Sequence, residues 1–229
     1  MKRIAQIFII TFLLFGCKSE RANKYYEIAY DLEEKDKYEE AIKYLDKAIE
    51  INPKFEQAYL DRAIDKSIIG DYEGAIIDLD KLIELRPDGI EPYVWRAEYK
   101  RMLDRYEAAI KDTEIALKLK KPIIIDSIVV GAAELNYNNP YIKNDNFDIE
   151  LEYILYERAA SNFNLGNYQS AFHDLNYCIQ KNLKTKECKF MRGIIYLNSE
   201  MNEEGCRDLN DAEKMETEYA VKEIEKYCK

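Results

Sequence analysis

The side chains best suited to polar chemistry in this sequence are arginines and aspartates that recur at a fixed spacing. In each pair the aspartate follows the arginine by 16 residues, as in Arg62 and Asp78, Arg96 and Asp112, Arg158 and Asp174, and Arg192 and Asp208. On two facing antiparallel helices, such a guanidinium group can bind the carboxylate as a bidentate ion pair. We therefore predict structural bridges between helices. The alternative is a ladder of guanidinium groups for an acidic ligand, but each arginine already has its own carboxylate.

Other residue types that support catalysis are sparse. The only histidine, His173, lies among acidic and amide residues, and the acidic pairs at 33–34 and 39–40 are typical of solvated helix faces. The sequence contains no nucleophile elbow, Walker loop, dinucleotide fingerprint or zinc-protease motif. We therefore expect no enzymatic activity, no cofactor and no metal site.

The charge balance bears on the kind of partner. Lysine and arginine total 34 against 44 acidic residues, which gives a net charge of −10, and the sequence has no basic stripe. A protein that binds a nucleic-acid duplex needs such a stripe, so we expect no nucleic-acid partner. Glycine and proline number only 8 and 5, which favours long helices with short connections.

The elements that position these residues repeat along the chain. Tyr38, Tyr72 and Tyr106 are spaced by 34 residues, and an alanine follows each of them three residues later. A fourth copy follows around Tyr168, after one period plus 28 residues, and a fifth around Asn202. Small residues recur where paired helices would touch, at Ala29, Ala63, Ala97, Ala159 and Gly193.

The period of 34 residues, the small residues and the prolines that close the units resemble the tetratricopeptide repeat family. The resemblance implies an all-α fold, a right-handed α-solenoid of about five helix-turn-helix units plus a C-terminal capping helix. Units one to three are expected at 24–122, units four and five at 152–217, and the capping helix at 218–229. The insert at 123–151 is expected to begin with a buried helix, or an extension packed on the solenoid, and to continue as an Asn-rich loop.

The resemblance also implies a binding face, because tetratricopeptide proteins typically bind other proteins, often a peptide or a helix, in a concave groove. Transferring the family's groove positions residue by residue gives Tyr26, Tyr30, Leu60, Ile64, Val94, Glu98, Tyr156, Phe163, Phe190 and Ile194. These residues are mainly apolar or aromatic, which favours a partner segment of the same character. The alternative is that part of this stripe is packed core.

The N-terminus is a separate segment. Residues 1–16 combine Lys2 and Arg3 with an apolar run too short to span a bilayer, as in a signal peptide. The end of the run, Leu14-Phe15-Gly16-Cys17, resembles the bacterial lipoprotein signal, which implies that Cys17 carries the lipid and that residues 17–23 form a tether. An uncleaved anchor or plain secretion is the alternative. No acidic residue follows Cys17 directly, which favours the outer membrane over the inner.

The four remaining cysteines can oxidise outside the cytosol. Cys178 and Cys188 are each five residues from the expected turn near Leu183, and Cys206 and Cys228 are each 11 residues from the turn near Thr217. Equal depth on two antiparallel helices is a condition for a disulfide. We predict Cys178–Cys188 and Cys206–Cys228, with a buried free thiol as the alternative for Cys178.

These features indicate a non-enzymatic module, anchored by lipid in the bacterial cell envelope, that binds or assembles other proteins. The alternative is a surface accessory protein that captures a glycan or nutrient, for which Tyr137, Tyr141 and Phe147 of the insert would be the stacking residues. The sequence does not indicate an oligomeric state.

Overall fold

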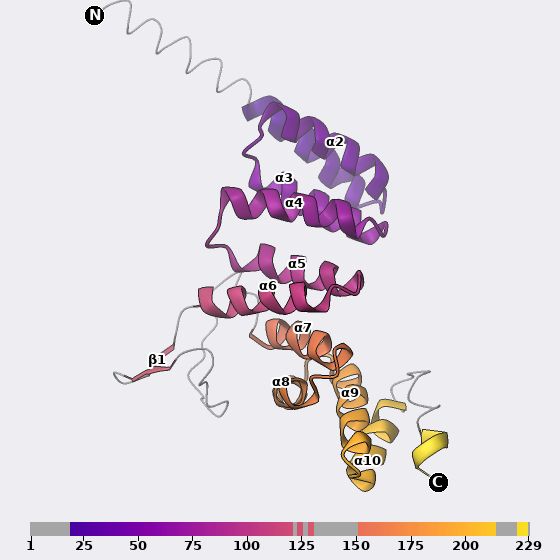
Figure 1. Cartoon of the computed structure of the whole chain (residues 1–229). Coiled ribbons are helices and arrows are strands. Elements are labelled where there is room, and N and C mark those ends of the chain that lie inside the picture. The colour runs from indigo at the N-terminus through magenta and orange to yellow at the C-terminus, as the bar shows by residue number, and fades with distance from the viewer. Residues whose placement is uncertain (1–18, 121–122, 126–127, 131–150, 214–223, 229) are drawn as a thin grey trace, which may run out of the picture. The chain divides into compact units, whose positions relative to one another are not determined.

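The computed structural model describes residues 19–120, 123–125, 128–130, 151–213 and 224–228, and these are helical apart from one short hairpin (Figure 1). The chain divides into two compact units, Met1–Pro92 (unit 1) and Tyr93–Lys229 (unit 2). The predicted signal peptide, Cys17, most of the insert and most of the capping helix lie outside the described residues; of the capping helix, residues 224–227 are helical.

Unit 1 consists of consecutive antiparallel helices. A first helix over residues 19–33 is followed by α2 (Tyr38–Ile51), α3 (Glu56–Ile68) and α4 (Tyr72–Leu85), and α5 (Ile90–Met102) begins at the end of the unit. The first helix includes residues 19–23, so our prediction of a tether over 17–23 was wrong for these residues. The reason is that Ala22 is already fully buried.

Unit 2 continues the same pattern of helix pairs. It contains most of α5, then α6 (Tyr106–Leu119), α7 (Leu151–Asn164), α8 (Tyr168–Gln180), α9 (Thr185–Asn198) and α10 (Asn202–Glu213). The second helix of each predicted unit therefore begins at the turn tyrosine, or at Asn202 in the fifth copy. The all-α architecture of helix-turn-helix units is confirmed.

The insert begins as a β-hairpin. The strands β1 (Ile123–Ile125) and β2 (Ile128–Val130) are antiparallel, with Ile123 opposite Val130 and Ile125 opposite Ile128. Our expectation of a helix at the start of the insert was wrong. Both segments consist only of isoleucine and valine, whose branched side chains favour strands, and the two residues between them suit a hairpin connection.

Small residues allow the paired helices to approach closely. Ala29, Ala63, Ala97 and Ala159 are all fully buried. A Cβ atom added to Gly193 of α9 would lie 2.9 Å from Cγ of Leu209, and one added to Gly205 of α10 would lie 2.8 Å from Cδ2 of Leu197. Larger residues at these glycines would force α9 and α10 apart, which is the packing role that the sequence pattern predicts.

The turn inside each helix pair has one residue in the left-handed conformation. These residues are Asp36, Gly70, Asp104, Gly166 and Glu200, with φ between 55° and 84°. The next residue donates its N–H to the carbonyl five positions earlier, as from Asp71 to Lys66 at 2.8 Å. This is the 6→1 bond of a Schellman motif, which satisfies a carbonyl at the helix end. Only Gly70 and Gly166 among them are of the residue type that adopts this conformation without steric cost.

The four predicted arginine–aspartate pairs are present. In each pair, Nε and Nη2 of the arginine donate to the two carboxylate oxygens, at 2.9 and 2.7 Å between Arg96 and Asp112. They join α3 to α4, α5 to α6, α7 to α8 and α9 to α10. The aspartates are 1–5% exposed. The pairs are therefore structural bridges, and the arginines do not form a ladder for an acidic ligand.

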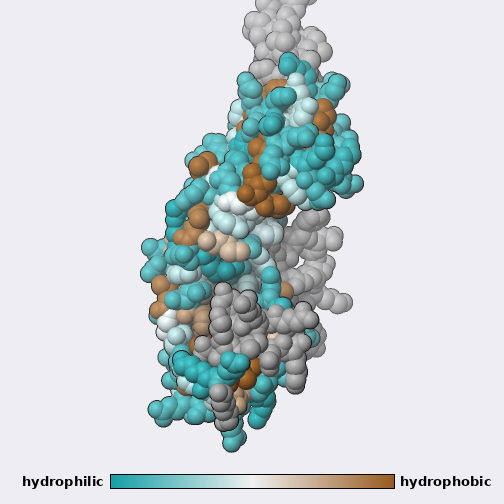
Figure 2. All heavy atoms as spheres, turned by 90° about the vertical axis from the view of Figure 1, so that its right-hand side faces the viewer, coloured by the Kyte–Doolittle hydropathy of each residue, from teal (hydrophilic) through white to brown (hydrophobic). Residues whose placement is uncertain are grey.

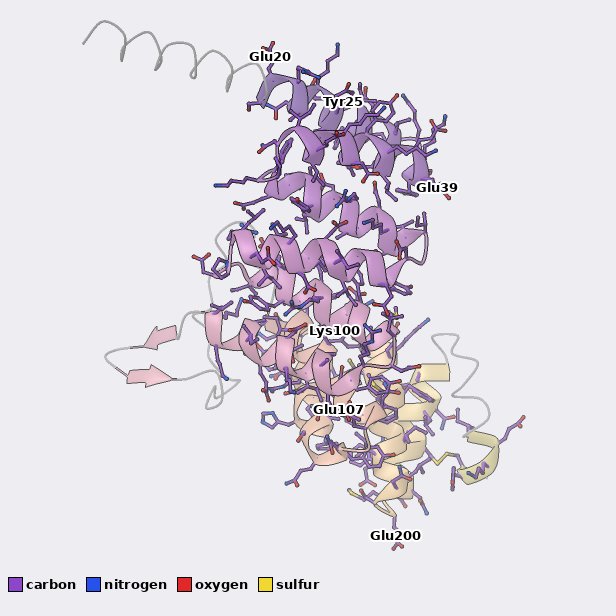
Figure 3. All side chains as sticks on the ribbon, turned by 45° about the horizontal axis from the view of Figure 1, so that its top comes forward. Glu20, Tyr25, Glu39, Lys100, Glu107 and Glu200 are labelled. Carbon is purple, nitrogen blue, oxygen red and sulfur yellow. A yellow bond between two sulfur atoms is a disulfide. The ribbon has the colours of Figure 1, made fainter. Side chains whose placement is uncertain are left out.

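One of the two predicted disulfides is confirmed. Cys206 on α10 is bonded to Cys228, with 5.5 Å between their Cα atoms (the yellow bond in Figure 3). This bond closes a loop of 22 residues and ties the described C-terminal residues to α10.

The other predicted disulfide was wrong, because Cys178 and Cys188 are free and buried. The thiol of Cys178 donates to the carbonyl of Glu152 at 3.3 Å, and that of Cys188 to the carbonyl of Leu183 at 3.6 Å. A hydrogen bond to Cys188 and burial raise the pKa of Cys178. Both thiols therefore behave as small apolar residues that satisfy backbone carbonyls.

Candidate binding face

The predicted groove residues differ in exposure. Val94 is fully buried and Tyr156 is 8% exposed, so these two are packed core and the prediction of a partner contact was wrong for them. Tyr30 is the most exposed, at 53%. The others are half-buried: Tyr26, Leu60, Ile64, Glu98, Phe163, Phe190 and Ile194. Their role in partner binding stays a prediction.

The apolar surface is not continuous on the face drawn in Figure 2. Among the coloured residues, hydrophobic atoms form several separate patches, with hydrophilic residues between them.

In unit 1 one predicted position on the first helix, Tyr26, contacts α3 and the residue that precedes it. The hydroxyl of Tyr26 donates to Oδ2 of Asp61 at 2.6 Å, and its ring lies 5.0 Å from that of Phe55. Tyr26, Tyr30 and Glu33 are spaced i, i+4 and i+7, so they share one face of the helix. Exposed Tyr30 therefore lies on the same helix face as the residues that contact α3.

Three carboxylates gather at this place, and we call Glu33, Asp61 and Asp65 the acid cluster. Glu33 ends the first helix, and the two aspartates lie one turn apart on α3. Asp65 is 2% exposed and shares a hydrogen bond with Glu33, while Glu33 and Asp61 are half-buried. The carboxyl groups of Asp65 and Glu33 therefore share a proton in the deepest part of the acid cluster.

The pKa values in the acid cluster reflect this crowding. Burial and the neighbouring charges of Glu33 and Asp61 raise the pKa of Asp65 to about 7. Burial also raises the pKa of Glu33 and of Asp61, although Tyr26 and Gln57 donate to Asp61 and oppose the shift. Near neutral pH the acid cluster therefore retains protons that isolated carboxylic acids would have lost.

Neighbouring lysines do not neutralise the acid cluster. Lys66 on α3 donates to Asp78 at 2.8 Å, and Lys37 pairs with Glu40 at 3.4 Å. In the described part of the chain, no lysine or arginine lies within ion-pair distance of Glu33, Asp61 or Asp65.

Unit 2 has a neutralised version of the same arrangement. Two repeats after Glu33, the sequence has Arg101 on α5, and Glu157 on α7 takes the repeat position of Asp61. Nε and Nη2 of Arg101 donate to the two carboxylate oxygens of Glu157 at 2.7 and 3.3 Å. Glu157 is 1% exposed, so its charge is buried with a partner.

The acid cluster was missed by the sequence analysis, although a signal existed. In the repeat numbering that relates the arginine–aspartate pairs, Glu33 also has the position of Arg101, and Asp61 has the position of Glu157. The sequence therefore shows that Glu33 stands at the position of an arginine and Asp61 at the position of another acid. That these two residues lie close together depends on which helices pack against each other, and only the structure shows this.

His173 does not form a catalytic pair. Its Nδ1 lies 3.8 Å from Asp174, beyond hydrogen-bond distance, and Arg158 already binds both oxygens of that aspartate. The histidine side chain is 63% exposed and lines an open hollow with Glu114 and Ser170. This arrangement is that of a solvated residue next to a structural bridge.

Two other expectations concern residues that the structure does not describe. Cys17, the predicted lipid site, and the aromatic residues of the insert proposed for glycan capture both lie outside the described ranges. Among the helices in those ranges, none has the length and apolar character required to cross a bilayer.

Comparisons with known proteins agree with this architecture. Residues 22–55 match the family model described as tetratricopeptide repeat. The structure is similar to that of YrrB, described as "a TPR protein with an unusual peptide-binding site", with 14% identity, a TM-score of 0.66, and coverage of 94% of this chain and 97% of that one. It is also similar to MamA from Desulfovibrio magneticus RS-1, at 13% identity and a TM-score of 0.66, covering 86% and 95% of the two chains.

A third similar structure is PilW, a type IV pilus biogenesis factor, at 13% identity and a TM-score of 0.60, covering 84% of this chain and 76% of that one. No curated protein sequence matches the chain significantly. Residues 22–55 are a tetratricopeptide repeat, and the chain has the fold of tetratricopeptide-repeat proteins.

Proposed function

We propose that this protein is a non-enzymatic module, attached by lipid to the bacterial cell envelope, that binds a segment of another protein on the face of unit 1 that carries Tyr30. The observation that carries the proposal is the exposure of this tyrosine, 53%, on the same helix face as half-buried Tyr26. An aromatic side chain that is large and exposed beside packed aromatic neighbours is a common anchor in protein interfaces.

The attachment to lipid rests on the sequence before the first helix. Cys17 follows a short apolar run and a glycine, and the first described helix begins at residue 19. Two or more acyl chains on one residue give a stable membrane anchor. With so short a connection, unit 1 would be held next to the bilayer, and its partner would be another envelope protein.

Site-specific photocrosslinking in living cells tests the binding face. A photoreactive amino acid at Tyr30 is expected to give a discrete crosslinked protein. Ile77 on α4 is the control, because it is another exposed large hydrophobic residue of unit 1, at 66%. Equal crosslinking from both positions, or none from Tyr30, would contradict the proposed binding face.

The anchor is tested separately. Metabolic labelling with a fatty-acid analogue is expected to label the wild-type chain, and the Cys17→Ser variant is expected to lose the label and the membrane association. Labelling that persists in this variant would contradict the lipid attachment at Cys17, without bearing on the binding face.

A further inference from the structure

One hollow in unit 2 lies at a place that a lysine fills in other helix pairs. Lys66 on α3 donates to Oδ2 of Asp78 at 2.8 Å and to the carbonyl of Gly74 at 3.5 Å. Lys100 on α5 donates to Oδ2 of Asp112 at 2.7 Å in the same way. In both helix pairs the aspartate therefore binds an ammonium group as well as its arginine.

The helix pair α7–α8 has an asparagine instead of this lysine. Asn162 takes the repeat position, four residues after Arg158. Its Nδ2 donates to the carbonyl of Arg158 at 3.0 Å, and its Oδ1 accepts from Asn167 at 3.2 Å. Asp174, which is 1% exposed, binds the guanidinium group of Arg158 at 2.8 Å. Because asparagine is short and uncharged, this repeat position supplies no ammonium group to the aspartate.

The space that the lysine fills elsewhere is open in this helix pair. The hollow beside His173 has a volume of about 290 Å³, far more than the roughly 15 Å³ that one water molecule needs. Four of its lining residues share their repeat positions with Lys66 and its neighbours, and they are Arg158, Asn162, Ser170 and Asp174. The hollow therefore corresponds to the lysine site of the other helix pairs.

The lining groups suit an ammonium group on an aliphatic stem. An ammonium group has three donors and no acceptor, and the carboxylate of Asp174, the amide oxygen of Asn162 and the hydroxyl group of Ser170 can each accept. Glu114 adds a second carboxylate, so two acidic groups line the hollow against one guanidinium group. Ile110 offers an apolar wall against which the stem can pack.

We infer that the hollow beside His173 binds a primary ammonium group, carried by a free alkylamine or by a lysine side chain. The bound group takes the place that Lys66 and Lys100 fill from within the chain. All residues that line the hollow belong to unit 2, so the inference is independent of the binding face at Tyr30.

Titration with n-butylamine tests the site. The full-length chain in detergent micelles, labelled with ¹³C and ¹⁵N, is followed by NMR at the carboxyl signal of Asp174 and the side-chain amide signal of Asn162. Both signals are expected to shift in a saturable way near neutral pH. The controls are n-butanol, which lacks the charge, and butyltrimethylammonium, which lacks the N–H donors. Each control is expected to bind at least tenfold more weakly.

A second probe identifies the source of the ammonium group. Nα-acetyl-lysine amide should bind at least as tightly as n-butylamine if the site takes a lysine side chain, and more weakly if it takes a free amine. Both results uphold the ammonium site.

Variants localise the binding. Asn162→Lys supplies the ammonium group from within and is expected to weaken binding of n-butylamine at least tenfold, whereas Asn164→Lys, at an exposed position of α7, should weaken it less than threefold. Glu114→Lys on α6 changes an exposed residue, so the fold should be kept, and it is expected to weaken binding at least fivefold. Glu107→Lys, two turns earlier on α6, is its control.

Three results would overturn the inference. They are equal binding of n-butylamine and either control compound, unchanged binding in the folded Asn162→Lys and Glu114→Lys variants, and no saturable response at Asp174. None of them bears on the proposed function, which depends on the crosslink from Tyr30.

Discussion

Unit 1 and unit 2 treat the same repeat position in opposite ways. In unit 2, Glu157 is 1% exposed and bound by Arg101, so a buried charge is neutralised inside the protein. In unit 1 the same repeat position is Asp61, which lies with Glu33 and Asp65 in the acid cluster; burial raises the pKa of Asp61, and that of buried Asp65 is raised to about 7. The ion pair of unit 2 joins α5 to α7, whereas the acid cluster of unit 1 retains a proton near neutral pH and destabilises the folded chain as it ionises.

This difference shows how a repeat architecture separates stability from binding. All four arginine–aspartate bridges are kept as pairs, and they fix helix against helix. The repeats tolerate one unpaired acid cluster because each unit contributes to stability mainly through its own packing and that of its neighbours. Functional sites commonly retain such locally unfavourable groups.

The largest expected effect comes from removing the arginine that neutralises the buried carboxylate of Glu157 in unit 2. Arg101→Met leaves the carboxylate of Glu157 buried and unpaired, which should lower the free energy of unfolding by about 3–5 kcal/mol in urea denaturation. Lys111→Met on α6, an exposed lysine, should change it by less than about 0.5 kcal/mol. Equal effects of the two variants would mean that Arg101 is not a buried structural partner.

Removing a carboxylate from the acid cluster should stabilise the chain instead of destabilising it, and the size of this effect should depend on pH. The pKa of Asp65 is about 7 in the folded chain and 3.8 without perturbation, so the folded state binds the proton more tightly. The contribution of Asp65 to stability should therefore be fully present below about pH 4 and be lost as the pH rises through about 7, by about 3 kcal/mol between pH 4 and pH 7.

The Asp65→Asn variant isolates this contribution. It removes the titrating group, so the difference in free energy of unfolding between variant and wild type should grow between pH 4 and pH 7 in favour of the variant. A difference that stays constant across this range would show that Asp65 titrates normally in the folded protein.

A smaller effect is expected from copying the arrangement of unit 2 into unit 1. Glu33→Arg places a guanidinium group opposite Asp61, as Arg101 stands opposite Glu157, and should stabilise the chain by about 1 kcal/mol at pH 8. Glu34→Arg is the control for added charge, and an equal gain from it would argue against a specific pair.

The smallest expected effect concerns the turns within the helix pairs, which have a glycine at some copies and a larger residue at others in both units. Gly70 of unit 1 and Glu200 of unit 2, with φ of 61°, are left-handed at the same repeat position (Glu200 is labelled in Figure 3). Glu200→Gly should raise the free energy of unfolding by about 0.5 kcal/mol, since relief of strain exceeds the entropy lost. Glu203→Gly, inside α10, should lower it by a similar amount.

Much of the architecture could be predicted from the sequence because it is periodic. The helix pairs, the four bridges and the small contact residues all follow from a spacing of 34 residues, which fixes where a residue lies in its unit. The disulfide of Cys206 and Cys228 followed from their equal distance to a turn. The same argument was wrong for Cys178 and Cys188, because depth along two helices does not determine what each thiol contacts.

The sequence by itself determined the order of helices and the residues that join them, because these depend on contacts within one repeat. Only the tertiary structure decided that Val94 is core, that the insert begins as a hairpin, and that Glu33 meets Asp61 and Asp65. These outcomes depend on contacts between repeats or outside them. The physical reason is that burial and charge are shared between neighbouring helices, whereas a sequence pattern specifies one helix face at a time.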